Sequence, residues 1–176
     1  MSTFDPLADN PVIREFVEHW GVMARSWGIN ATMGELFALL YITGVDWTAE
    51  DLCARLKVSR GNVSMNLREL IAWGVVHKIH RQGERREFFR AETDVWTLFR
   101  RILTERKRRE LEPTLAVLSQ TREYVVRHVE LAPLEERIVS LSRFFDLINT
   151  LASKLTTIDQ DDLEDLSRLF GLYDDE

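Results

Sequence analysis

The order of short elements between residues 48 and 91 constrains the fold of this 176-residue chain more than any other feature. Thr48 and the two acidic residues that follow Ala49 predict the N-cap and first turn of a short helix. Ser59 predicts the N-cap of a second helix, which Gly74 ends. Two short helices joined by a tight turn are the minimum pattern of a helix-turn-helix.

The hydrophobic period changes after Gly74. Residues 75–81 are rich in strand-forming side chains, Gly83 lies in a polar turn, and residues 86–90 form a second candidate strand. A β-hairpin directly after a helix-turn-helix is a wing. The expected fold class is therefore mainly α, a winged helix-turn-helix with a two-stranded β-wing and a helical dimerisation module.

Two helices are expected before this reader. Asn10 and Pro11 predict an N-cap and a first helical residue, and an apolar stripe follows at helical spacing. Thr32 and Glu35 have the spacing of a capping box, so a second helix is expected from about Thr32 until Gly44 stops it.

Residues after Asp94 have a helical pattern throughout. Pro113 cannot donate a hydrogen bond to the carbonyl of Arg109, so a kink or break is expected there. Pro133 begins a further helix, and a short acidic helix is expected over residues 159–170. Apolar residues at alternating spacings of four and three predict that the helix after Pro133 packs lengthwise on a partner helix: Leu134, Ile138, Leu141, Phe145, Ile148, Ala152 and Leu155.

These patterns divide the chain into three expected regions. Residues 1–30 would form an N-terminal dimerisation helix, residues 31–92 the winged helix-turn-helix, and residues 93–176 a long helix with a C-terminal dimerisation region. With 45% hydrophobic residues, no signal peptide and no long apolar run, the chain is expected to be globular and cytoplasmic, without a membrane span. The lone Cys53 excludes an internal disulfide and leaves a core role or a redox-sensing role open.

Charge is distributed unevenly along the chain. The net charge is −6, but the window from Cys53 to Arg90 holds nine Arg and Lys against three Glu. This window carries +6, so the rest of the chain carries −12. A strongly basic middle segment in an acidic chain is expected to face a polyanion such as double-stranded DNA.

The second short helix has one face suited to reading DNA. Opposite its apolar side it carries small, polar and basic residues, which allow close approach to a major groove and offer hydrogen bonds to base edges. Arginines around a hairpin tip suit a narrow minor groove. The expected DNA contacts are Ser59, Arg60, Gly61, Asn62, Ser64, Met65 and Arg68 from the helix, and Arg81, Arg85 and Arg86 from the wing.

Several local motifs resemble one family of regulators. The stretches Ser59-Arg-Gly-Asn-Val-Ser64, Asn66-Leu-Arg-Glu-Leu70, Trp73-Gly-Val75 and Gly83-Glu-Arg85 resemble the GbsR-type branch of the MarR superfamily, over about residues 20–91. The resemblance implies a homodimeric winged-helix protein that binds a pseudo-palindromic operator. It further implies a ligand-responsive repressor that competes with polymerase, with residues 59–68 as recognition helix and Arg85 as wing arginine. Phe88-Phe89 departs from the tyrosines frequent in that branch.

Aromatic side chains outside the reader suggest an effector site. Within such a family, the faces of Trp20, Trp27, Trp96 and Phe99 could hold a quaternary ammonium such as choline by cation–π attraction. Aromatic packing at a dimer interface is the alternative interpretation of the same residues.

The sequence gives little support for catalysis, cofactor binding or metal binding. No phosphate loop or nucleophile elbow occurs, so neither enzyme activity nor a cofactor is expected. His77 and His80 would point to opposite faces of a strand, so no metal site is expected. Arg106 to Arg109 could touch DNA or keep a helix solvated, and solvation is favoured. A winged-helix protein-interaction module without sequence-specific DNA binding remains the alternative function.

Overall fold

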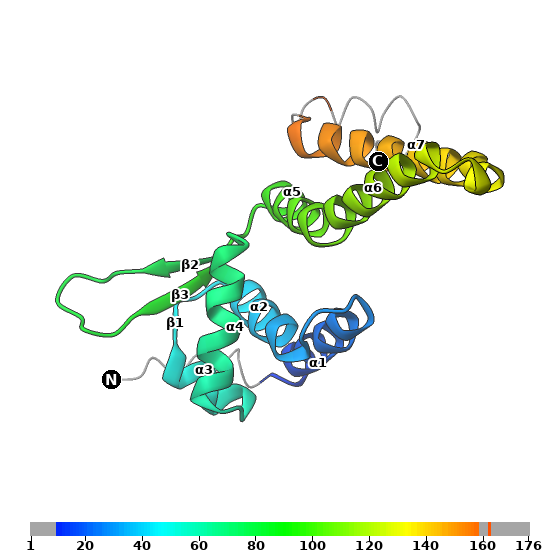
Figure 1. Cartoon of the computed structure of the whole chain (residues 1–176). Coiled ribbons are helices and arrows are strands. Elements are labelled where there is room, and N and C mark those ends of the chain that lie inside the picture. Colours follow the sequence, from blue (N-terminus) through cyan, green and yellow to red (C-terminus); the bar gives the residue numbers. More distant parts are fainter. Residues whose placement is uncertain (1–9, 159–161, 163–176) are drawn as a thin grey trace. The chain divides into compact units, whose positions relative to one another are not determined.

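The computed structural model describes residues 10–158 and residue 162. The chain forms two compact units, and the boundary between them falls after Leu98 (Figure 1). The first unit contains, in order, α1 (Pro11–Ser26), α2 (Ala31–Thr43), β1 (Trp47–Thr48), α3 (Ala49–Leu56), α4 (Arg60–Ala72), β2 (Val76–Ile79) and β3 (Phe88–Ala91). Helix α5 (Val95–Arg106) crosses the boundary. The helix expected over residues 159–170 lies, except for residue 162, outside the described residues.

Helices α1 and α2 pack closely along each other. A Cβ atom on Gly34 would lie 2.6 Å from the Ala24 Cβ atom and 2.8 Å from the Trp20 carbonyl oxygen. A glycine at position 34 is therefore what allows the backbones of the two helices to come so near. The interface continues through the Trp20 and Phe37 rings, whose centroids are 6.0 Å apart.

The caps of these two helices agree only partly with the expectation. Asn10 caps α1 as predicted, and its side chain accepts the N–H of Val12 at 2.9 Å. The capping box expected at Thr32 is wrong, because Asn30 is the N-cap of α2 and accepts the N–H of Thr32 at 2.9 Å. An asparagine placed two residues before Thr32 satisfies the free amides of the first turn just as well. Gly44 ends α2 in the left-handed region, as predicted.

The helix-turn-helix consists of α3 and α4. Thr48 and Ser59 cap the two helices, as predicted, and each side chain accepts the N–H three residues ahead. Between them Lys57 adopts a φ of 55°, which turns the chain between the helices. Leu52 of α3 and Val63 of α4 have no exposed surface, so both helices contribute to the core with α2.

The wing belongs to a three-stranded antiparallel sheet with the order β1-β3-β2. The hairpin of β2 and β3 extends away from the helices of its unit (Figure 1). Its second strand begins at Phe88, two residues later than expected. The sequence did not predict β1, in which Trp47 pairs with Phe89. The winged helix-turn-helix is confirmed as the fold, with a third strand that attaches the hairpin to the helical core.

The second unit continues from α5 through the π-helix η2 (Lys107–Leu111), α6 (Glu112–Arg127), the 3₁₀ turn η3 (Val129–Leu131) and α7 (Ala132–Thr157). At Pro113 the helical chain changes register instead of breaking. The N–H of Glu112 donates to the carbonyl of Lys107, a π-type bond, immediately before Pro113. Because Pro113 has no N–H, a wider turn at this point keeps the chain helical around the missing donor.

Helix α7 packs against α6, but the seam predicted along it does not face one environment. Ala152 is 8% exposed, whereas Leu134 and Leu141 are each 45% exposed. The members of the predicted seam therefore differ in exposure, and the packing of its exposed members on a partner helix stays a prediction. One face meets α6, and the other carries a stripe of exposed apolar side chains, called here the α7 stripe: Leu134, Leu141, Phe144, Leu147, Ile148, Leu151 and Leu155.

Candidate nucleic-acid interface

One face of α4 is exposed and the opposite face is buried. Val63, Leu67 and Leu70 are at most 2% exposed and anchor the helix in the core. The opposite side consists of residues expected to contact DNA, namely Arg60, Gly61, Ser64, Met65 and Arg68, all of them exposed. The Ser59 hydroxyl also lies at the surface, where it caps the helix by accepting the N–H of Asn62 at 3.3 Å.

Asn62 makes hydrogen bonds to a buried side chain of α4 and to a side chain of α2. Its Oδ1 accepts a hydrogen bond of 2.6 Å from Nδ2 of Asn66, a side chain only 1% exposed. Its own Nδ2 donates to the Thr32 hydroxyl of α2 at 3.4 Å. Asn62 therefore links α4 to α2 by a polar contact beside the apolar face that anchors the helix. Sequence reasoning gave this residue a base-reading role and did not detect the internal contacts.

The two arginines of α4 make contacts that DNA could replace. Arg60 Nη2 lies 3.0 Å from Glu50 of α3, in a pair with exposed side chains. Arg68 Nε donates to the Ser64 carbonyl at 3.2 Å. Because exposed ion pairs contribute at most about 1 kcal/mol, both guanidinium groups can turn toward phosphates or base edges at low cost.

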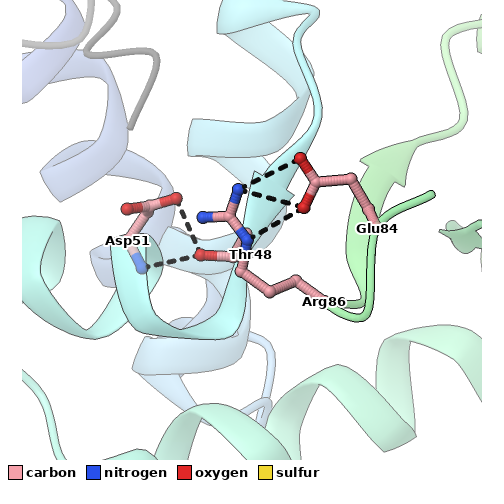
Figure 2. Close-up of polar contacts among 4 residues, drawn as sticks. All are labelled: Thr48, Asp51, Glu84 and Arg86. Carbon is pink, nitrogen blue, oxygen red and sulfur yellow. Dashed lines mark hydrogen bonds and ion pairs between the residues drawn. The ribbon is translucent and has the colours of Figure 1, made fainter. Parts of the chain in front are cut away.

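The tip of the wing holds Arg85 and Arg86 in different settings. Figure 2 shows the Arg86 guanidinium facing the carboxylate of Glu84, with Nη2 and Oε2 3.2 Å apart. Arg85 is exposed and has no hydrogen bond or ion pair with any residue of the part of the chain that is described. Arg85 is thus the wing arginine with a free guanidinium.

Arg81 lies two residues after the end of β2, and its guanidinium contacts Asp46 of the loop before β1. Its Nη2 is 2.9 Å from Oδ2 of Asp46, and Nε of Arg90 is 2.5 Å from Oδ1 of the same carboxylate. The Arg81 guanidinium also lies 4.2 Å from the centroid of the Phe88 ring. Together these contacts join the end of β2 and strand β3 to the loop before β1.

Asp46 is the functional candidate that sequence reasoning missed. Its side chain is 3% exposed. Burial raises the pKa of the carboxyl group, but hydrogen bonds from Arg90 and Arg81, with the charges of both, outweigh burial and lower the pKa below its ordinary value. Asp46 lies 35 residues before Arg81 and 44 before Arg90, so only the strand register could have revealed the cluster.

The aromatic residues expected around an effector lie on two helices. Trp20 packs in the α1–α2 interface beside Phe16 and Phe37. Trp27 follows α1 and is 51% exposed. Trp96 and Phe99 both belong to α5, on either side of the boundary between the two units.

The basic run at residues 106–109 is held by contacts within its own unit. Arg106 Nη1 lies 3.3 Å from Glu110, and Arg108 Nη2 lies 2.7 Å from Glu105. Lys107 Nζ donates to the Ser153 hydroxyl at 2.9 Å and so joins η2 to α7.

The histidine and cysteine side chains considered for metal or redox chemistry lie outside α4. His77 lies 3.3 Å from Glu92, and Cys53 is half-buried on α3. Across residues 10–158 and 162, no three His, Cys, Asp or Glu side chains gather in a way that could hold a metal ion. Nor does that part of the chain contain a helix long and apolar enough to cross a membrane.

The exposed face of α4 and the basic hairpin belong to one unit, and the comparison with family models covers the same part of the chain. Residues 27–87 match the model of the MarR family. The matched segment covers α2, the helix-turn-helix and most of the hairpin. The match supports the MarR superfamily for this segment and leaves the GbsR-type branch untested.

Two individual proteins are similar to this chain. The HTH-type transcriptional regulator MmpR5 of Mycobacterium tuberculosis (strain ATCC 25618 / H37Rv) is 32% identical over 87 residues, which are 49% of this chain and 53% of the relative. The chain thus matches about half the length of that relative. A crystal structure of a transcriptional regulator has a TM-score of 0.58 and 23% identity, and the match covers 83% of this chain and 96% of the other. This likeness supports the fold.

Proposed function

We propose that the chain is a sequence-specific DNA-binding transcriptional regulator of the MarR type, acting in the cytoplasm. The observation that carries the proposal is the exposed face of α4 in the same unit as a wing whose tip arginine, Arg85, has a free guanidinium. The match of residues 27–87 to the MarR family supports the same function.

On operator DNA, α4 would enter the major groove with its exposed face toward the bases. Arg68 can donate two hydrogen bonds to a guanine, Ser64 can contact a base edge, and Met65 can contact a thymine methyl group. Arg85 would enter the adjacent minor groove, where a narrow groove attracts an arginine side chain. A good bidentate contact contributes about 1–3 kcal/mol of discrimination, so Arg68 would carry much of the specificity.

The working unit in this proposal is a homodimer on a pseudo-palindromic operator. The α7 stripe supports it, because Leu141, Phe144, Ile148, Leu151 and Leu155 are exposed at alternating spacings of three and four. A second copy of the same helix is the partner that such a self-complementary heptad pattern fits. Two recognition helices related by a two-fold axis would then address half-sites about one helical turn apart.

The experiment is a titration of the protein against the DNA upstream of its own coding region, at two salt concentrations. Replacing both Arg68 and Arg85 with alanine should weaken binding by about 100-fold, as expected for the loss of one base contact and one groove contact. It should also reduce the slope of log affinity against log salt by about 1. A matched control replaces Arg122 and Arg137, exposed arginines of α6 and α7, and should bind as the wild type does.

Salt-insensitive or absent binding by the wild type would contradict the proposal and favour the protein-interaction module. Equal binding by the Arg68/Arg85 variant would mean that another surface contacts DNA.

Three finer parts of the proposal rest on the resemblance. They are the GbsR-type branch, the repressor role and release by a small ligand, with a quaternary ammonium as the ligand class to test first. An Arg68-dependent DNA complex that choline dissociates only when Trp96 is present would support the aromatic site. Choline binding unchanged by Trp96→Ala would remove Trp96 from it.

A further inference from the structure

A single buried carboxylate lies where the wing joins the rest of its unit. In the β1–β3 register Trp47 is opposite Phe89, so Asp46, one residue before Trp47, comes opposite Arg90. Arg81 approaches the same carboxylate from the end of β2. Asp46 thus contacts both sides of the hairpin, although it belongs to neither of its strands.

We propose that Asp46 is a positioning residue for DNA recognition, which fixes the direction of the β2–β3 hairpin relative to α4 through Arg81 and Arg90. The inference rests on the proposed DNA-binding function and adds a specificity-determining residue to it. Strand β1 is directly followed by α3, whose Thr48 cap is anchored to Asp51, as Figure 2 shows. The cluster of Asp46, Arg81 and Arg90 therefore connects the hairpin to the helix-turn-helix through the two residues of β1.

The geometry of the cluster favours positioning over a direct role in DNA contact. The Asp46 side chain is 3% exposed, while those of Arg81 and Arg90 are 45% and 52% exposed. Arg90 donates to Asp46 through its inner Nε and Arg81 through its terminal Nη2, and the Arg81 guanidinium also packs on Phe88. A short β1 of two residues offers few backbone hydrogen bonds of its own to hold the hairpin. Buried side chains of the hairpin, among them Val76, Phe88 and Phe89, pack it on the core, and the two charge-assisted bonds of Asp46 add directional polar contacts to that packing.

The direction in which DNA affinity changes when the Asp46 carboxylate is removed distinguishes a positioning role from electrostatic repulsion of DNA. A carboxylate near a DNA-binding surface repels phosphates, and its removal should strengthen binding to any DNA sequence. If Asp46 positions the wing, its removal should instead weaken binding to the operator, since Arg85 would no longer reach the minor groove beside the bound α4. Binding to unrelated DNA, which depends on charge alone, should stay equal or become tighter.

The test compares Asp46→Asn with Glu87→Gln, a control that also removes one negative charge from the wing region. Glu87 forms an exposed ion pair with Lys78 on the same hairpin. Affinities for operator and for unrelated DNA are measured, and amide hydrogen exchange is followed in residues 76–91 and in residues 33–40 of the core. Arg90→Gln provides a second variant, because it removes the guanidinium that donates to Asp46 from β3.

Asp46→Asn should lose about tenfold in operator affinity, the size expected when a charged hydrogen-bonding partner is removed, and little or none for unrelated DNA. Exchange should become faster in residues 76–91 and stay unchanged in residues 33–40. The double variant with Arg90→Gln should be hardly weaker than either single variant, because both act through the same cluster.

Unchanged exchange in the hairpin, or operator binding that tightens as it does in Glu87→Gln, would overturn the proposal. A wild type that binds no DNA would refute the proposed function instead. In that case hydrogen exchange in the free protein would still decide whether Asp46 holds the hairpin.

Discussion

Gly61 lies in the first turn of α4, on the face proposed to enter the major groove. Apart from the adjacent residues and the backbone of its own helix, no atom lies within 4 Å of the position that a Cβ would occupy there. Gly61→Ala should therefore stabilise the protein by about 0.5–1 kcal/mol, because alanine loses less backbone freedom in a helix. The same methyl group would obstruct close approach of the backbone to DNA, so operator affinity should fall. Thermal unfolding and the DNA titration measure the two effects.

The control for Gly61 is Ala72→Gly, at the other end of the exposed face of α4. It should reduce stability by a similar amount and leave operator affinity nearly unchanged. If Gly61→Ala raised both stability and affinity, the first turn of α4 would not lie close to DNA.

At the scale of single residues, the sequence predicted which side chains of α4 are exposed, but not which of them form hydrogen bonds with other parts of the chain. Helical periodicity identifies the face that carries Ser64, Met65 and Arg68, because burial follows the 3.6-residue repeat. Periodicity contains no information on Asn62 bonding to Thr32, a contact 30 residues away. Periodicity likewise did not predict the contacts of Arg81 with Asp46 and Phe88. Long-range polar contacts depend on tertiary packing and strand register, which local patterns do not specify.

At the scale of elements, a half-buried acidic side chain, that of Glu35, lies in the α1–α2 interface. The Cγ and Oε1 atoms of Glu35 would each lie 2.7 Å from a Cβ atom at Gly21, so the carboxyl group occupies space that only glycine leaves open. Burial raises the pKa of Glu35, Arg25 lowers it and Glu18 raises it, with a net increase above 4.5. The folded protein consequently binds a proton more tightly than the unfolded chain at this site.

The sign of this shift gives a pH-dependent prediction for the two helices. Between pH 4.5 and the raised pKa the folded state holds more protons, so the free energy of unfolding falls as pH rises. Glu35→Gln should remove this loss and make the protein more stable than the wild type near neutral pH. Urea unfolding across this pH range measures it, with Glu15→Gln, on the exposed side of α1, as control. Equal pH dependence in wild type and Glu35→Gln would contradict the prediction.

The elements themselves were predicted well where a local signal defines their ends. Side-chain caps at Asn10, Thr48 and Ser59 act within three residues, and each begins a helix as expected. Strand β1 was missed because two residues are too few for a period, and because its partner Phe89 lies far along the chain. Pro113 predicted a disturbance correctly, but a missing donor does not determine whether the helix breaks or widens into a π turn.

At the scale of the whole molecule, α7 has apolar side chains that stay exposed in the described part of the chain. Residues at heptad spacing were predicted from sequence to face a partner helix, and the pattern in fact serves two faces. Phe145 is half-buried and Ala152 is buried, whereas Ile148 is 38% and Leu151 50% exposed. Sequence periodicity alone could not divide these faces, because both repeat at alternating spacings of three and four.

Ile148→Glu tests whether a second copy covers the α7 stripe. Since Ile148 is exposed within one chain, glutamate there should change the stability of the monomer little. At a two-fold axis, two such glutamates would be buried close together, so sedimentation equilibrium should show a shift from dimer to monomer. Thr150→Glu adds the same charge to α7 beside the stripe and should remain dimeric.

The shift from dimer to monomer should also change DNA binding, because a dimer contacts both half-sites of an operator at once. When a dimer binds one half-site, the second recognition helix is held near the other half-site at a high effective concentration, and a monomer lacks this advantage. Ile148→Glu should therefore lose affinity for an operator with two half-sites and keep the wild-type affinity for a single half-site. Equal loss on both DNAs would indicate damage to the reader itself, and a variant that stayed dimeric would exclude the α7 stripe as the interface.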